Sequence, residues 1–251
     1  MIFHVAIFFY SLLFFLFLTW ITERASVPSW TFYLSTIIPL LILSGVAAKR
    51  LVGRLISAFL PGVVAFSAPL LLSLIDESLR QQIFIFGASG LYYFSLLGIY
   101  RLHTAPCDQT ARAMQNVAAL GSLFFVYAAS YGLYLNYEVP LWLLMAVFYG
   151  ATFVVSFQTL LALAPERKSF ILLLSTCLGL IFGEFIWLLH FWPFGYLTSG
   201  IATLLLYYWI WKVVFDALRG NFSQKGFLIE SLILLGLLIL LLTSSPWRMV
   251  V

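Results

Sequence analysis

The chain has 251 residues, of which 63% are hydrophobic and only 9% are charged, with a formal net charge of +4. Soluble domains average about 45–50% apolar and about 25% charged residues, so this composition excludes a soluble globular protein. The basic residues are scattered along the chain instead of forming a cluster. We therefore expect no nucleic-acid partner and take the lipid bilayer as the first partner of the chain.

Apolar runs of roughly 18 to 22 residues recur along the sequence, and each is long enough to cross a hydrocarbon core about 30 Å thick as a helix. In chain order the predicted spans are 2–22, 31–48, 55–75, 83–100, 114–135, 141–161, 169–190, 196–215 and 227–244. The runs are continuous rather than alternating apolar and polar residues, which disfavours a transmembrane barrel. We predict an all-α, polytopic transmembrane helix bundle of about nine spans, forming one integral membrane domain over 1–251.

The thirteen Lys and Arg residues predict the orientation of these spans, because basic residues favour cytoplasmic loops. With a cytoplasmic N-terminus, the outer loops hold only Arg24, Arg80 and Arg248. The inner loops then hold Lys49, Arg50, Arg54, Arg101, Arg112, Arg167, Lys168, Lys212, Arg219 and Lys225. The sequence therefore predicts a cytoplasmic N-terminus and a C-terminus outside.

The seventh predicted span carries small residues at helical spacing, which is the pattern that allows two helices to approach closely in lipid. Ser175, Gly179 and Gly183 share one face of this span. They predict a seam of close helix packing.

The stretch FGEFIWLLHFWPFGY, 182–196, places Glu184 inside an otherwise apolar run. An ionised carboxylate there is costly, so we expect Glu184 to be protonated, solvated by a cavity, or paired from another helix. Ser89 and Ser130 lie at comparable predicted depth, and His190 lies two turns further along the same helix but about 120° round it. These four residues form the candidate intramembrane polar site. A proton- or cation-responsive site and a neutral interhelical hydrogen bond both remain open for Glu184.

The stretch FGASGLYYFSLLG, 86–98, resembles the GxSG nucleophile motif of rhomboid intramembrane proteases, with Ser89 in the nucleophile position. Such a serine needs a base within hydrogen-bond reach. That family supplies a histidine two spans later, and the sixth predicted span here contains none. His4 and His103 are predicted on the cytoplasmic side and His190 at the outer rim. We therefore predict no catalytic residue and no enzyme activity, with a protease at Ser89 as a remote alternative.

Charged residues near the inner ends of the last two spans are expected to pair with one another. Lys212 and Asp216 are spaced i to i+4 on the eighth span, and Glu230 lies one turn into the ninth. Three separated histidines and two cysteines form no ligand-spacing motif, and nucleotide-binding patterns are missing. We predict no metal site and no cofactor.

Two segments carry a family resemblance: LLGIYRLHTAPCDQTARAMQ at 96–115, and GEFIWLLHFWPFGYLTSGIATLLLYYWIW continuing to FDALRGNFSQKGFLIE, at 183–230. Together they are similar to an uncharacterised multi-span protein family of ultrasmall, reduced-genome bacteria. The resemblance implies a multi-pass protein of the bacterial cytoplasmic (inner) membrane. It implies no activity and no catalytic residue.

For function, the leading expectation is a non-enzymatic scaffold or subunit of a membrane complex, with a membrane-protein partner or a second copy of the chain. It rests on the lack of soluble domains, internal repeats and catalytic constellations in the sequence. The alternative is a small-solute or proton-coupled transporter that uses Glu184.

Overall fold

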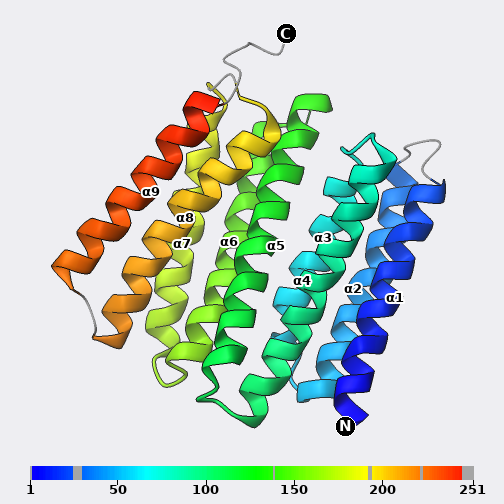
Figure 1. The fold of residues 1–251 in the computed structure, drawn as a ribbon, viewed down its shortest axis with the longest axis horizontal. Helices are drawn as coiled ribbons and strands as arrows, with labels where there is room; N and C mark the ends of the chain where they lie inside the picture. The colour runs from blue at the N-terminus through cyan, green and yellow to red at the C-terminus, as the bar shows by residue number, and fades with distance from the viewer. Residues whose placement is uncertain (1, 25–29, 138, 192–193, 221–222, 245–251) are drawn as a thin grey trace. The chain divides into compact units, whose positions relative to one another are not determined.

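The computed structural model of the chain describes residues 2–24, 30–137, 139–191, 194–220 and 223–244. Within these residues the regular structure is entirely helical (Figure 1). The elements are α1 (Ile2–Arg24), α2 (Trp30–Val52), the 3-10 helix η1 (Leu55–Ala58), α3 (Phe59–Leu72), α4 (Ser78–Thr104), α5 (Gln109–Asn136), α6 (Leu141–Leu163), α7 (Lys168–Leu189), α8 (Tyr196–Arg219) and α9 (Gln224–Ser244).

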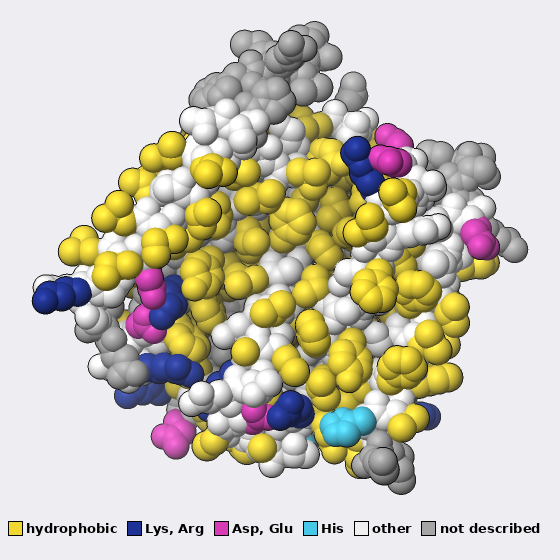
Figure 2. Space-filling view, in the orientation of Figure 1, with side chains coloured by type: hydrophobic (Ala, Val, Ile, Leu, Met, Phe, Trp, Pro, Cys, Tyr) yellow, Lys and Arg dark blue, Asp and Glu magenta, His cyan; other side chains and the backbone are white. Residues whose placement is uncertain are grey.

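Nine helical segments of the described chain, with η1 and α3 counted as one, are long and apolar enough to cross a membrane. This confirms the all-α prediction and the predicted number of long apolar helices. On the face drawn in Figure 2, hydrophobic side chains cover much of the surface, while most charged side chains lie near its margins. Arg248, which was predicted in an outer loop, lies outside the described residues.

Several predicted boundaries are corrected by the structure. The helix α4 begins at Ser78 rather than 83, and α5 begins at Gln109 rather than 114. Both extensions are mainly polar, and a hydropathy criterion omits such turns when they continue a helix beyond its apolar run. The start of α5 is fixed by Asp108, whose Oδ1 accepts hydrogen bonds from the backbone N–H groups of Thr110 and Ala111 at 2.9 and 3.2 Å.

The third predicted span, 55–75, is also corrected. It opens with the 3-10 turn η1, whose backbone hydrogen bond runs from the Ser57 N–H to the Arg54 carbonyl, and α3 ends at Leu72. Pro61 lies in the first turn of α3, where its missing N–H removes no intrahelical hydrogen bond. The other six predicted ranges extend by one to four residues at one or both ends, apart from the seventh, which shifts back by one residue.

The chain forms two compact units, Met1–Val126 and Tyr127–Val251, and the single domain over 1–251 stays a prediction. In the first unit, the ring of Phe14 on α1 stacks on Tyr92 of α4 with centroids 4.3 Å apart. On the same two helices, the Ser11 hydroxyl donates to the Ser89 carbonyl at 3.0 Å. The core of this unit is therefore built around the contact of α1 with α4.

The core of the second unit is built around the contact of α6 with α7. A β-carbon on Gly179 would lie 3.0 Å from the carbonyl oxygen of Tyr149, and one on Gly183 would lie 3.3 Å from the Tyr149 Cβ. Ser175 is buried on the same side of α7. The predicted small-residue seam is thus confirmed, with α6 as its partner.

The last helix, α9, has no buried residue. It is joined to α8 by the Trp209 indole N–H, which donates to the Ser231 hydroxyl at 2.9 Å, and by the stacking of Trp209 on Phe227. The helix therefore contacts its unit chiefly through α8.

Candidate functional site

Glu184 lies on the exposed face of α7, five residues before the helix ends at Leu189. Its carboxylate makes no hydrogen bond or ion pair to any residue that the structure describes. The packing seam explains this direction, because Gly183 faces Tyr149 and the next residue along an α-helix points about 100° away. Packing of α7 on α6 through this seam therefore directs the Glu184 side chain away from the rest of its unit.

A continuous exposed stripe surrounds Glu184. Its positions are spaced alternately three and four residues apart, and every side chain in it is exposed: Phe170, Leu173, Cys177, Leu180, Glu184, Trp187 and Phe191. We call this set the Glu184 stripe. Trp187 is 52% exposed and makes an edge contact with Phe191, which is 66% exposed. The 3-4 spacing is the pattern by which one helix packs along another, and Glu184 is its single charged position.

The other members of the predicted polar site do not gather round Glu184. His190 Nδ1 lies 2.5 Å from the Tyr134 hydroxyl, so this histidine is engaged with α5. Ser130 is buried on α5, whereas Glu184 is exposed. The structure therefore does not assemble these three residues into one polar site.

Ser89, the fourth member, belongs to the first unit. Its side chain is 7% exposed, and its hydroxyl has no hydrogen-bond partner among the described residues. Its backbone carbonyl is the group that accepts from Ser11. The arrangement around Ser89 is helix packing of α1 on α4, without a base bonded to the hydroxyl.

The structure brings together the three charged residues that were expected to pair, where α8 ends and α9 begins. Lys212 Nζ lies 2.7 Å from an Asp216 carboxylate oxygen and 3.6 Å from one of Glu230. They line a cavity of about 240 Å³ together with Val213, Ser223, Gly226 and Phe227. One lysine thus bridges two carboxylates and links α8 to α9.

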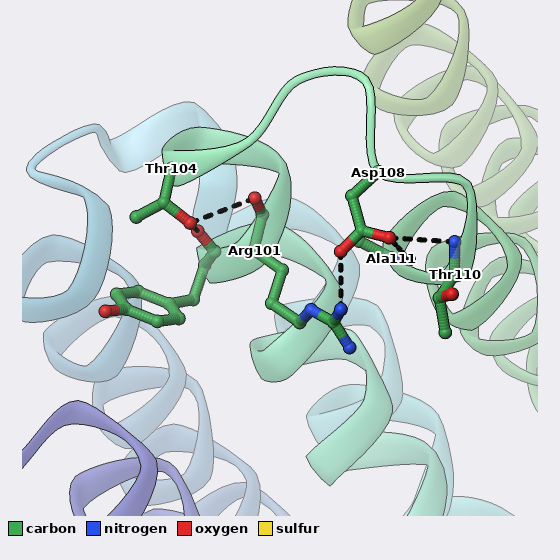
Figure 3. Close-up of polar contacts among 6 residues, drawn as sticks. Arg101, Thr104, Asp108, Thr110 and Ala111 are labelled. Atoms are coloured by element: carbon green, nitrogen blue, oxygen red, sulfur yellow. Dashed lines mark hydrogen bonds and ion pairs between the residues drawn. The ribbon is translucent and has the colours of Figure 1, made fainter. Parts of the chain in front are cut away.

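Sequence reasoning missed a second polar cluster, at the junction of α4 and α5 (Figure 3). Arg101 Nη2 lies 2.7 Å from Asp108 Oδ2, while Oδ1 of the same carboxylate caps α5. Beside Arg101 lies a cavity of about 570 Å³, lined by His4, Tyr93, Leu97, Tyr100, Arg101 and Thr104. Two signals were present in the sequence: an aspartate just before a helix, and polar residues at helical spacing from 93 to 104.

In the described part of the chain, no three His, Cys, Asp or Glu side chains lie together in a group that could hold a metal ion. Cys107 and Cys177 are both free and exposed.

Comparison with known proteins gives one result. No curated protein and no solved structure matches the chain. The family described as "Protein of unknown function (DUF5656)" matches residues 35–245, which includes α7, α8 and the Arg101–Asp108 junction. The chain therefore belongs to the DUF5656 family.

Proposed function

We propose that this chain is a multi-pass protein of the bacterial cytoplasmic membrane and acts as a non-enzymatic scaffold or subunit of a membrane complex. The Glu184 stripe carries the proposal, because it is an apolar helix face with one unpartnered carboxylate in its middle. An ionisable side chain left alone in hydrocarbon is costly, and such residues pair with other groups. A partner that supplies a hydrogen-bond donor to Glu184 removes this cost.

The orientation proposed for this protein has the N-terminus in the cytoplasm and the C-terminus outside. It rests on the ten basic residues assigned to inner loops against three assigned to outer loops. The proposed location in a bacterial membrane rests on the resemblance to a family of ultrasmall, reduced-genome bacteria.

The occupant proposed for the Glu184 stripe is a transmembrane helix of a different membrane protein, with a Lys, Arg, amide or hydroxyl group at the depth of Glu184. Charge complementarity favours this over a second copy of the chain. Two copies joined symmetrically through the stripe would place Glu184 against Glu184, and like charges that close are unfavourable unless they share a proton. A single polar position in an apolar stripe also fixes the register of the partner helix.

The experiment uses Cys177, a member of the stripe, as the attachment site of a photoreactive probe. Cys177 lies seven residues before Glu184, which is about 20° round the helix and about 10 Å along it. The variant Cys107→Ser leaves Cys177 as the single cysteine, since the chain has two. The matched control is a probe on α9, placed by Leu237→Cys in a background without either native cysteine; Leu237 is 47% exposed.

Irradiation in native membranes, followed by purification and mass spectrometry, should give one stoichiometric protein adduct from Cys177 and none from position 237. Glu184→Leu should abolish this adduct, and the contact peptide should contain a donor side chain. Capture of lipid alone from both positions would assign the stripe to the bilayer and overturn the proposal. A self-adduct, or an adduct with residues 1–126 of the same chain, would overturn the assignment of the occupant.

The second candidate function is small-solute or proton-coupled transport at Glu184. It is favoured by the same exposure, because a carboxylate that is not bonded within its unit is available to a proton or a cation. Transport requires that Glu184→Gln abolish proton flux in proteoliposomes while the fold is kept. A scaffold gives no Glu184-dependent flux, so this assay separates the two functions.

A further inference from the structure

The cavity beside Arg101 lies at the end of the first unit where α1 begins and α4 ends. Its α4 residues, Tyr93, Leu97, Tyr100 and Thr104, recur every three or four positions and so line one face of the helix. His4 of α1 closes the other side, with its ring in edge contact with Tyr100 at 5.8 Å. No carboxylate is among the lining residues.

We propose that this cavity binds the phosphate of an anionic lipid headgroup. The lining offers the guanidinium of Arg101, the imidazole of His4 and the phenol hydroxyls of Tyr93 and Tyr100. The Thr104 hydroxyl already donates to the backbone carbonyls of Tyr100 and Arg101, at 3.2 and 3.1 Å. Guanidinium and hydroxyl donors form the charge-assisted hydrogen bonds by which proteins hold phosphate oxygens. This set is therefore suited to a phosphate rather than to a cation.

Asp108 positions Arg101 without using all of its donors. The carboxylate takes one guanidinium nitrogen through Oδ2, while Oδ1 accepts from the first turn of α5 (Figure 3). Part of the negative charge is thus balanced by the N-terminus of α5, where an anion is favoured by the helix dipole. The other guanidinium nitrogens of Arg101 contact no described acceptor within hydrogen-bond distance. The arginine is therefore held in place with donors left for a ligand.

The extent of the cavity along α4 and its apolar lining residue favour a lipid over a free ion. From Arg101 back to Tyr93 is eight residues, or about 12 Å along α4, and Leu97 lies between them. The cavity thus extends along α4 from a charged residue past an apolar one. The same end of the unit carries Lys49, Arg50, Arg54 and Arg112, and Asp108 is its single acidic residue. Such an end attracts anionic lipid, and the cavity gives the headgroup a defined place.

Native mass spectrometry of the purified full chain in non-ionic detergent tests the proposal, with phosphatidylglycerol, phosphatidylcholine and inorganic phosphate as probes. We expect one phosphatidylglycerol to be retained at least tenfold more tightly than either other probe. Arg101→Ala should weaken its binding about tenfold or more, as expected for losing a charged hydrogen-bond donor. Tyr93→Phe changes neither charge nor any described hydrogen bond, and it should weaken binding about threefold.

Arg50→Ala is the matched control, because it removes the same charge from the same end outside the cavity and should change binding less than Arg101→Ala. Equal losses in the two arginine variants would show diffuse attraction and overturn the site. An unchanged affinity in both Tyr93→Phe and Arg101→Ala would also overturn it. Equal binding of inorganic phosphate and phosphatidylglycerol would keep the phosphate chemistry and overturn the lipid as its source. None of these results depends on Glu184.

Discussion

Gly179 of α7 faces the carbonyl oxygen of Tyr149 on α6, so closely that an added β-carbon would lie 3.0 Å from that oxygen. The contact is with backbone, which cannot rotate away as a long side chain does. We expect Gly179→Ala to destabilise the second unit by about 1–3 kcal/mol, as overpacking of a close contact does. Gly150→Ala is the control, because a β-carbon there meets nothing within 4 Å.

Thermal unfolding of the purified protein in detergent measures the difference between the two glycine variants. Equal melting temperatures for Gly179→Ala and Gly150→Ala would contradict the described seam. Gly183→Ala should fall between them, since its β-carbon would lie 3.3 Å from the nearest atoms.

Glu184→Leu should leave the stability of the isolated protein within about 0.5 kcal/mol of the original, because surface substitutions away from specific contacts have small effects. The physical reason is that the carboxylate is exposed and bonds to no described residue. Detergent unfolding of Glu184→Leu beside Glu184→Gln is the measurement. A loss of about 1 kcal/mol confined to Glu184→Leu would instead mean that the carboxyl group bonds a neighbouring helix of its own chain, as the neutral interhelical hydrogen bond considered from the sequence requires.

Lys212→Met should loosen α9 from α8. It leaves Asp216 and Glu230 facing each other without the cation that lies between them. We expect faster amide hydrogen exchange in the first turns of α9, over 224–231, with little change in α6 and α7. Lys225→Met removes an exposed lysine from the same region and serves as the control. If both variants exchange alike, the bridging role of Lys212 is wrong.

Asp108→Ala should destabilise the start of α5 by about 1 kcal/mol, the usual cost of losing an N-cap. Asp108→Asn keeps the oxygen that accepts from Thr110 and Ala111 but loses the ion pair with Arg101. Hydrogen exchange over 109–113 should therefore rise in the alanine variant and stay near the original in the asparagine variant. The opposite order would mean that the ion pair, and not the cap, holds this junction.

Ser89→Ala should be neutral or slightly stabilising, because it removes a buried hydroxyl that has no described partner. A serine-reactive fluorophosphonate probe should also leave Ser89 unlabelled. Labelling of Ser89 that disappears in Ser89→Ala would revive the intramembrane protease hypothesis.

Much of the helix pattern follows from the sequence, since apolar length alone locates a helix that must satisfy all its backbone groups internally. The start of α6 at Leu141, after Pro140, and of α8 at Tyr196, after Gly195, match the predicted positions. The starts of α4 and α5 do not, because polar first turns are held by local hydrogen bonds that hydropathy does not count. The seam at Gly179 and Gly183 is readable from spacing, but its partner Tyr149 is not.

The surroundings of Glu184 and the cavity beside Arg101 were less predictable, because they depend on how separate helices pack. A sequence fixes the direction of Glu184 relative to its own helix, but not which directions the neighbouring helices occupy. The cavity beside Arg101 joins His4 to Tyr100 and Arg101, residues separated by most of the first unit. No local pattern connects them, so only the packing of α1 on α4 reveals the cluster.

Because α9 is exposed, its packing constrains the order of its residues much less than the packing of α7 constrains the order there. The helix has no buried residue, so no leucine in it fills a specific place in a core, and one leucine can replace another. Reordering the Leu and Ile residues of α9 between 232 and 242 should leave its position unchanged, whereas the same reordering in α7 would misplace the glycines that meet Tyr149. The order of the Leu and Ile residues in α9 is thus largely interchangeable, whereas the positions of the glycines in α7 are required for its packing on α6.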